Sequence, residues 1–208
     1  MQLLLIRHAL PLRSEYGQGS DPELSETGLA QSKRLPDALA RFPITRLVSS
    51  PQRRAVQTAG PLAAVRGLSV DIDERLAEYD RELAGYLPVE QLRTERPQDW
   101  ARMAQGQLPA GVDEEAFCAR VKAALTDVVA AADADETVAV FSHGGVINVA
   151  LHQILGTARL LSFPIDYVSV TRLLYSRSGQ AAVASTNCTE HVWDLLPRNQ
   201  QRLPGDGE

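Results

Sequence analysis

The apolar residues of the chain fall into short runs separated by stretches with helical periodicity. Short strands are predicted at six places: 3–6, 46–49, 68–72, 137–141, 168–175 and 181–185. The run at 3–6 is typical of a strand buried on both faces, and the run at 137–141 of another buried strand. The last two runs predict a hairpin that turns around Gly179.

Helix signals lie between these runs. Ser25 is a suitable N-cap for a helix that starts at Glu26 and runs towards Arg41. Pro36 lies inside that pattern and predicts a kink or a break. Ser50 is the expected cap of the next helix, with Pro51 at its first position.

A longer helix is expected after Asp113, which is its N-cap, and another helix is expected over 145–155. The apolar face of the longer helix consists of Phe117, Val121, Ala124, Leu125, Val128 and Val129. Strands that alternate with helices in this way predict an α/β fold. Its central sheet is expected to be mostly parallel, with helices on both faces.

The 208 residues favour one domain over 1–196. Prolines and glycines interrupt the pattern at 80–112, which predicts an excursion of loops and short helices over one end of that domain. The polar stretch 197–208 is expected to be a flexible tail.

Composition narrows the choice of environment and partner. A net charge of −5 argues against a protein that binds nucleic acid or an anionic membrane. The first apolar run is too short for a signal peptide or a membrane helix. Cys118 and Cys188 form no disulfide framework or zinc pattern, so a reducing cytoplasm is expected, with a single disulfide between them as the alternative.

Arginine and histidine residues follow shortly after three of the predicted strands. Arg7 and His8 follow the first strand, Arg53 and Arg54 follow the second, and His143 follows the strand at 137–141. The carboxyl ends of parallel strands meet at one edge of the sheet, where open α/β sheets bind ligands. We therefore expect these side chains to lie close together.

The residue types at this edge indicate an anion site. Arg53 and Arg54 lie in the first turn of a helix, where the helix dipole disfavours a cation unless an anion is held there too. Gly144 and Gly145 would let the backbone approach that anion closely. Each motif alone has an ordinary structural explanation, but together they predict a pocket for a dianionic phosphoryl group.

The same segments resemble those of a known family. Arg7-His8-Ala9 after an apolar strand is similar to the Arg-His-Gly signature of the histidine phosphatase superfamily, also called phosphoglycerate mutase-like. Ala9 replaces the usual glycine. Four further segments resemble this family, in order along the chain: 24–28, 49–59, 142–145, and the C-terminal stretch with Asn187, Thr189 and His191.

The resemblance implies roles for five residues. His8 would be the nucleophile that becomes phosphohistidine, and Arg7, Arg54 and His143 would bind the phosphate oxygens. Glu78 would donate a proton to the leaving group and then activate water. The cations replace the magnesium that other phosphoryl-transfer sites use, so no metal and no cofactor are implied.

The segment 76–85 departs from the family pattern, because Glu82 stands where a glycine is usual. Asp80 and Glu82 therefore remain alternatives to Glu78 as the proton donor. A metal site is not favoured by the remaining ligands: His143 and His152 are nine residues apart on a predicted helix and project to opposite faces.

Three functions are compatible with these residues. A phosphate-monoester hydrolase is favoured, a phosphoglycerate-type mutase is the alternative, and a phospho-ligand-binding protein without activity is disfavoured by the retained nucleophile. The expected partner is a small phosphorylated metabolite. The oligomeric state stays open, a homodimer included. The candidates for contact with the leaving group are Arg13, Tyr16, Arg81 and Tyr86.

Overall fold

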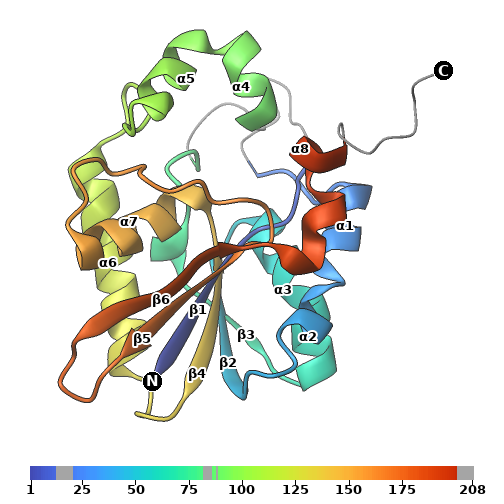
Figure 1. Ribbon diagram of the computed structural model, residues 1–208, viewed down its shortest axis with the longest axis vertical. Coiled ribbons are helices and arrows are strands. Elements are labelled where there is room, and N and C mark those ends of the chain that lie inside the picture. The colour runs from blue at the N-terminus through green and yellow to red at the C-terminus, as the bar shows by residue number, and fades with distance from the viewer. Residues whose placement is uncertain (13–20, 82–85, 88, 201–208) are drawn as a thin grey trace.

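A computed structural model describes residues 1–12, 21–81, 86, 87 and 89–200 of the chain. Its centre is a six-stranded sheet with the strand order β3-β2-β4-β1-β5-β6 (Figure 1). The strands are β1 Gln2–Arg7, β2 Ile44–Ser49, β3 Val70–Ile72, β4 Thr137–Ser142, β5 Val170–Tyr175 and β6 Ala181–Cys188. Strands β1 to β4 are parallel, while β5 runs antiparallel to both β1 and β6. The mostly parallel α/β sheet and its terminal hairpin are thus confirmed.

Helices cover both faces and one end of the sheet. Their bounds are α1 Glu26–Ser32, α2 Leu35–Ala38, α3 Arg53–Arg66, α4 Val89–Glu95, α5 Pro97–Ala104, α6 Glu114–Ala130, α7 Gly144–Leu155 and α8 Pro197–Gln200, with 3-10 turns η1 Glu74–Leu76 and η2 Glu190–Leu195. In Figure 1, α6 and α7 lie on one face and α1 to α3 on the other. The excursion with α4 and α5 lies beyond the carboxyl end of β1. None of the helices in these ranges is long and apolar enough to cross a membrane.

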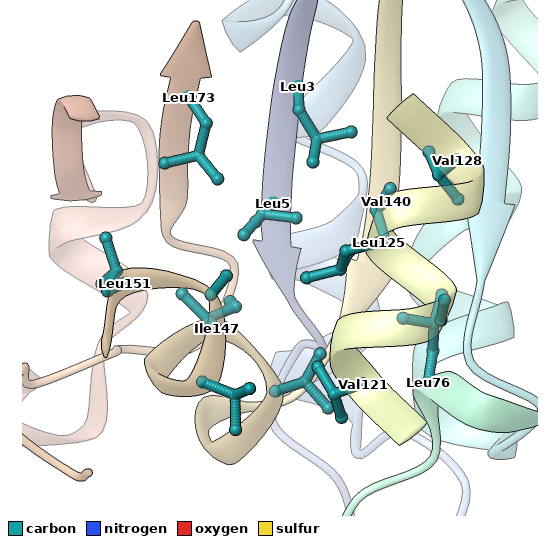
Figure 2. Packing of buried hydrophobic residues seen from close by; sticks show 14 of the residues in the cluster. Leu3, Leu5, Leu76, Val121, Leu125, Val128, Val140, Ile147, Leu151 and Leu173 are labelled. Atoms are coloured by element: carbon teal, nitrogen blue, oxygen red, sulfur yellow. The ribbon is translucent and has the colours of Figure 1, made fainter. Parts of the chain in front are cut away.

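The core consists of two apolar layers, one on each side of the sheet. Leu3 and Leu5 point into the layer shared with α6 and α7, as Figure 2 shows, while Leu4 and Ile6 belong to the opposite layer. All four side chains are fully buried, and each contributes about 1.5–3 kcal/mol through removal from water. The expected apolar face of α6 is buried, except that Val129 is only partly covered. β1 is therefore held rigidly from both sides, and with it the residues at its carboxyl end.

The predicted break in the first helical region is confirmed, but it precedes the proline. The helix ends at Ser32, and α2 begins at Leu35 with Pro36 in its first turn. Proline is tolerated there because the amide of that position has no partner within the helix. The second part ends at Ala38 and does not reach Arg41.

The prediction that Ser50 caps α3 is wrong. The helix begins at Arg53 with Gln52 as its N-cap, and Gln52 makes no side-chain capping bond. The carboxylate of Asp21, from a distant segment, accepts the Arg53 N–H at 2.7 Å instead. Ser50 is thereby left for a different contact, with His143.

The C-terminal stretch also differs from the expectation of a flexible tail that starts at 197. Pro197–Gln200 form the short helix α8, and Arg198 makes an ion pair with Asp166 at 2.8 Å. This pair ties the end of the described chain to the loop before β5.

Candidate active site

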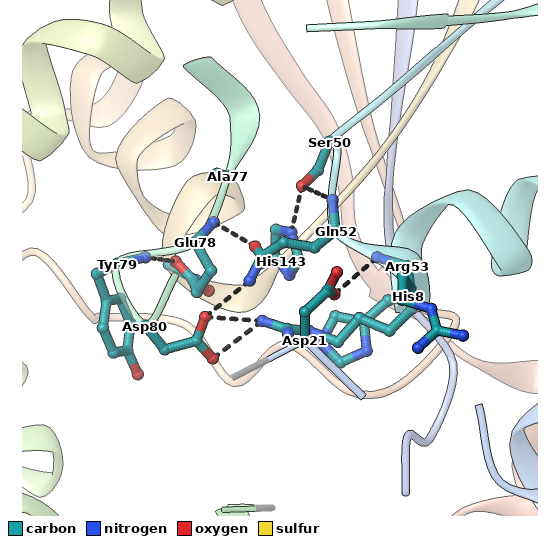
Figure 3. A network of polar contacts seen from close by, with 12 residues as sticks. His8, Asp21, Ser50, Gln52, Arg53, Ala77, Glu78, Tyr79, Asp80 and His143 are labelled. Atoms are coloured by element: carbon teal, nitrogen blue, oxygen red, sulfur yellow. Dashed lines mark hydrogen bonds and ion pairs between the residues drawn. The ribbon is translucent and has the colours of Figure 1, made fainter. Parts of the chain in front are cut away.

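The three strand ends named by the sequence meet as predicted, because β2, β4 and β1 are neighbours in the sheet. A pocket of about 570 Å³ opens at this edge, and Arg7, His8, Arg54 and Glu78 line it. His143 lies just behind this lining, fully buried, with its ring centroid 5.1 Å from that of His8. The structure thus brings all five predicted site residues together. Three of them, His8, Glu78 and His143, are labelled in Figure 3.

His8 is held in one orientation and one tautomer. Its side chain is 3% exposed, and its Nδ1 lies 2.8 Å from the carbonyl oxygen of Ala9. A carbonyl accepts but cannot donate, so Nδ1 carries the proton and Nε2 keeps its lone pair. Burial, reinforced by the charges of Arg54 and Arg7, lowers the pKa of His8 well below its ordinary value. The ring is therefore neutral at physiological pH, as a nucleophile must be.

His143 is oriented by a serine from the end of β2. Its Nε2 lies 2.7 Å from the Ser50 hydroxyl, which also accepts the backbone N–H of Gln52 at 3.3 Å. A hydroxyl that accepts one N–H can still donate its own proton, so we assign that proton to the bond with Nε2 and the ring proton to Nδ1. Nδ1 has no hydrogen-bond partner among the described residues. A buried N–H of this kind suits an oxygen supplied by a ligand.

Arg54 is fully buried and already engages a carboxylate. Its Nη2 lies 2.8 and 2.9 Å from the two carboxylate oxygens of Asp80, and its guanidinium stacks 4.7 Å from the Tyr86 ring centre. Asp80 also accepts a bond from the Gln52 side chain at 3.0 Å. The Arg54 cation is thus fixed before any ligand binds.

Arg7 is the second cation of the pocket. Its Nη1 donates to the carbonyl oxygen of Ile165, and its guanidinium lies 4.0 Å from the centre of the Tyr167 ring. Both contacts come from the loop before β5. They hold a flexible side chain in place at the lining of the pocket.

Glu78 is a buried carboxyl group at the start of α7. It is 6% exposed, and it accepts the N–H of Gly145 at 2.8 Å and that of Tyr79 at 3.2 Å. Burial, with the nearby charge of Asp80, raises its pKa from 4.5 to about 7, against the lowering effect of these two bonds. Glu78 is therefore divided between its acid and carboxylate forms near neutral pH.

Gly145 has a different role from the one expected. The sequence suggested that it would let the backbone approach a bound anion. In the structure the close neighbour is Glu78 itself, and a Cβ on Gly145 would lie 2.4 Å from its Oε1. The glycine thus makes room for the carboxyl group at the helix N-terminus.

Gln52 is the residue that the sequence analysis missed. It is buried, its carbonyl oxygen accepts the Glu78 N–H at 2.7 Å, and its amide donates to Asp80. One side chain thereby fixes the backbone of Glu78 and the carboxylate of Asp80 relative to α3 (Figure 3). The available signal was a polar residue immediately before the two arginines of the helix start.

Of the other residues predicted to contact the leaving group or to donate the proton, some line the pocket and some do not. Tyr86 lines it, whereas Arg81 pairs with Glu74 at 2.6 Å on the surface. Arg13, Tyr16 and Glu82 lie outside the described residues. Asn187 bonds to Asp166 through both ends of its amide, and so holds the loop before β5.

A metal centre is not formed by the residues in view. In the described ranges no group of three or more His, Cys, Asp or Glu side chains is arranged to hold an ion, and Cys118 and Cys188 are free thiols.

Comparisons with known proteins agree with this geometry. The family model described as "Histidine phosphatase superfamily (branch 1)" matches residues 3–188. Phosphoserine phosphatase 1 of Hydrogenobacter thermophilus is 28% identical over 204 residues, which cover 94% of this chain and 96% of that protein. A probable phosphoglycerate mutase, GpmB of Enterobacter sp., is 28% identical over 165 residues, 75% of each chain. The structure of a mycobacterial glucosyl-3-phosphoglycerate phosphatase complexed with VO3 superimposes with a TM-score of 0.72 at 27% identity, covering 90% of this chain and 98% of that one.

Proposed function

The chain belongs to the histidine phosphatase superfamily, and we propose that it hydrolyses phosphate monoesters through a phosphohistidine formed on His8. The observation that supports this most directly is the fixed, neutral ring of His8. Its Nδ1 is bonded to Ala9 and its Nε2 keeps a lone pair at the floor of the pocket. A neutral imidazole in a set tautomer is ready to attack phosphorus.

In the first step Nε2 of His8 forms a bond to phosphorus while the ester P–O bond breaks. Negative charge is then spread over the three equatorial oxygens of the phosphoryl group. Arg7, Arg54 and the Nδ1–H of His143 are the donors assigned to these oxygens. They are oriented before the reaction by Tyr167, Asp80 and Ser50 respectively, so little reorganisation accompanies the step.

Glu78 is assigned the proton transfers. With a pKa of about 7 it is partly protonated at neutral pH, and it can give its proton to the leaving alkoxide. The resulting carboxylate can then take a proton from the water that attacks the phosphohistidine. Asp80 suits this role less well, because it is paired with the buried Arg54 cation.

The charge of the excursion at 80–112, whose helices α4 and α5 lie over the site, favours hydrolysis over mutase action. A mutase must exclude water and hold a small polyanion with additional cations. The sequence of the excursion has the cations Arg81, Arg93, Arg96 and Arg102 and the anions Asp80, Glu82, Glu90, Glu95 and Asp99, so its charges roughly balance. Relatives named as phosphatases and as a probable mutase make the distinction one for experiment.

The test pairs two assays on the same protein. Release of inorganic phosphate from a panel of monoesters is measured beside interconversion of 3- and 2-phosphoglycerate, with and without 2,3-bisphosphoglycerate. We expect phosphate release with little interconversion. Efficient primed interconversion without phosphate release would establish the mutase instead.

The nucleophile is tested by acid or base treatment of enzyme quenched during turnover with labelled substrate. Wild type is expected to contain an acid-labile, base-stable phosphoryl group, and His8→Ala to lack both this adduct and turnover. His152→Ala is the matched control, because His152 lies on α7 and its ring bonds the Thr157 hydroxyl at 2.9 Å. Full activity of His8→Ala would exclude the proposed mechanism.

A further inference from the structure

The pocket extends well beyond the space that a phosphoryl group needs. Its phosphate end is formed by Arg7, His8, Arg54 and Glu78, while the remainder of its volume of about 570 Å³ is bounded mainly by apolar side chains. On the proposed function, the alcohol portion of the substrate occupies this outer part. The chemistry of its walls therefore indicates the chemistry of that alcohol.

The first wall is one face of α5, and we call it the helix wall. It consists of Trp100, Met103 and Ala104, which are three and four residues apart and so share one side of the helix. No residue of α5 is buried. The apolar face of this helix is thus directed at the pocket and is left partly exposed by the described residues.

The second wall is the loop before β5, and we call it the loop wall. Leu161, Phe163 and Ile165 line the pocket from this side. Asn148 on α7 holds the loop at Phe163, where its side chain bonds both the backbone N–H at 3.0 Å and the carbonyl at 3.1 Å. The loop wall is therefore a fixed surface.

The two walls are joined directly to each other. The N–H of Leu161 donates to the carbonyl of Gly106 at 2.9 Å, just beyond the end of α5. Gly106 has a φ of +79°, and a Cβ there would lie 2.7 Å from the Cβ of Arg159. This close contact sets the separation of the walls, and with it the width of the slot between them.

The charges of the outer pocket do not select a second anionic group. Apart from Asp80, which is paired with Arg54 at the phosphate end, its described charged residues are two cations, Arg96 and Arg198, and two anions, Asp99 and Asp166. Arg198 and Asp166 are paired at 2.8 Å. A substrate with a carboxylate or a second phosphate beyond the ester oxygen would therefore lack a net positive field there.

We infer that the preferred substrates are phosphate monoesters of uncharged alcohols with an apolar, ring-sized body that fits between the helix wall and the loop wall. This inference rests on the proposed function and adds the class of leaving group. An aromatic or branched-alkyl body would cover Trp100, Met103 and Phe163, and would gain from its own removal from water.

The inference is tested with three substrates that differ in the group esterified to phosphate. They are 2-phenylethyl phosphate, ethyl phosphate and 3-phosphoglycerate. The parent alcohols of the first two have similar acidity, so those two differ mainly in the phenyl ring. We expect kcat/KM for 2-phenylethyl phosphate to exceed the value for each of the others by about tenfold or more, the gain typical of burying one phenyl ring. Equal values, or the highest value for 3-phosphoglycerate, would overturn the inference.

Variants of α5 test whether the helix wall is the source of the preference for the phenyl substrate. Trp100→Ala is expected to lower kcat/KM for the phenyl compound by a much larger factor than for ethyl phosphate, and so to remove most of the phenyl advantage. Gln98→Ala, an exposed position on the same helix, is the matched control. If Trp100→Ala does not fold, Met103→Gln, which keeps the side-chain length but adds polarity, is expected to reduce the same advantage. A uniform loss on both substrates would contradict the assignment.

Failure of the inference can be told apart from failure of the proposed function. Phosphonates are not hydrolysed, so calorimetry with 2-phenylethylphosphonate and ethylphosphonate reports the pocket without turnover. Tighter binding of the phenyl compound supports the inference even where no phosphate is released. Equal affinities, together with phosphate release from several monoesters, would leave the hydrolase proposal standing and exclude the apolar leaving group.

Discussion

The backbone amide of Gly145 and the carboxylate of Glu78 are joined by a 2.8 Å hydrogen bond at the first turn of α7. A Cβ on Gly145 would overlap the other carboxylate oxygen, so the position of the acid depends on the absence of a side chain. The helix N-terminus stabilises the carboxylate form, while burial favours the neutral form. These two opposing effects together set the pKa of Glu78.

The first prediction follows from this contact. Gly145→Ala displaces Glu78 and should reduce kcat/KM for alkyl phosphates by about 10- to 100-fold, because general acid catalysis is weakened. Aryl phosphates with good leaving groups should lose less. Gly60→Ala is the control, since Gly60 lies in α3 with no atom within 4 Å of an added Cβ. Equal losses for alkyl and aryl substrates would show that the glycine serves the fold and not the acid.

The second prediction concerns the pH dependence of activity. The phosphorylation step needs neutral His8 and protonated Glu78. With a pKa of about 7 for Glu78, kcat/KM for alkyl phosphates should fall above that pH, tenfold per unit once Glu78 is fully ionised. Because the pKa of His8 is lowered well below its ordinary value, protonation of His8 does not reduce kcat/KM near that value. A fall in kcat/KM below about pH 6 therefore reflects protonation of the substrate's phosphate dianion. Glu78→Gln should have low activity without the alkaline limb.

The third prediction concerns stability and the same group. The pKa of Glu78 rises from 4.5 to about 7 on folding, so between these pH values the folded chain binds more protons than the unfolded chain. The free energy of unfolding therefore falls as pH rises through this window, by up to about 3 kcal/mol from Glu78 alone. Urea titrations at pH 5 and pH 8 measure the change. Glu78→Gln should lack this contribution, and an unchanged slope in the variant would assign it to other groups.

The fourth prediction tests the serine behind His143. Ser50→Ala removes the partner of Nε2 and lets the ring proton move away from Nδ1, so kcat should fall by about tenfold or more while KM changes little. Ser49→Ala is the matched control, because Ser49 is also buried but its hydroxyl donates to the neighbouring carbonyl oxygen of Ser50. Similar kinetics for the two variants would remove Ser50 from the site.

The fifth prediction separates the two functions of Arg54. Arg54→Ala breaks a buried ion pair and should lower the free energy of unfolding by about 3–5 kcal/mol, because Asp80 loses its partner. The double variant with Asp80→Asn should regain part of this stability. It should not regain affinity for inorganic phosphate or activity, because the phosphate-binding cation is still absent. Recovery of activity in the double variant would contradict the role assigned to Arg54.

Local sequence signals were sufficient for the strands and for the meeting of Arg7, His8, Arg54 and His143. Strands buried on both faces have a strong apolar signature, and parallel strands necessarily place their carboxyl ends at one edge. The family resemblance then specified which of the residues at that edge would face a phosphate. These features depend on short segments whose structure is determined mainly by their own sequence.

The start of α3 and the environment of Glu78 could not be read in the same way. Ser50 has the residue type and position of a helix cap, yet a carboxylate from Asp21 caps the helix and Ser50 bonds His143. The rise in the pKa of Glu78 depends on burial beneath distant segments and on Asp80 being held by Gln52. Such effects arise from tertiary contacts, which a local pattern does not contain.

The absence of buried residues in α5 has a consequence for how proteins of this kind diverge. Substitutions at half-exposed helix positions usually change stability by no more than about 0.5 kcal/mol. Replacement of Trp100 or Met103 would therefore leave the fold and the residues at the strand ends nearly undisturbed. Mutation can thus explore new leaving groups along this helix while selection keeps His8 and its neighbours constant, so new substrate preferences can arise through a few tolerated changes in one short helix.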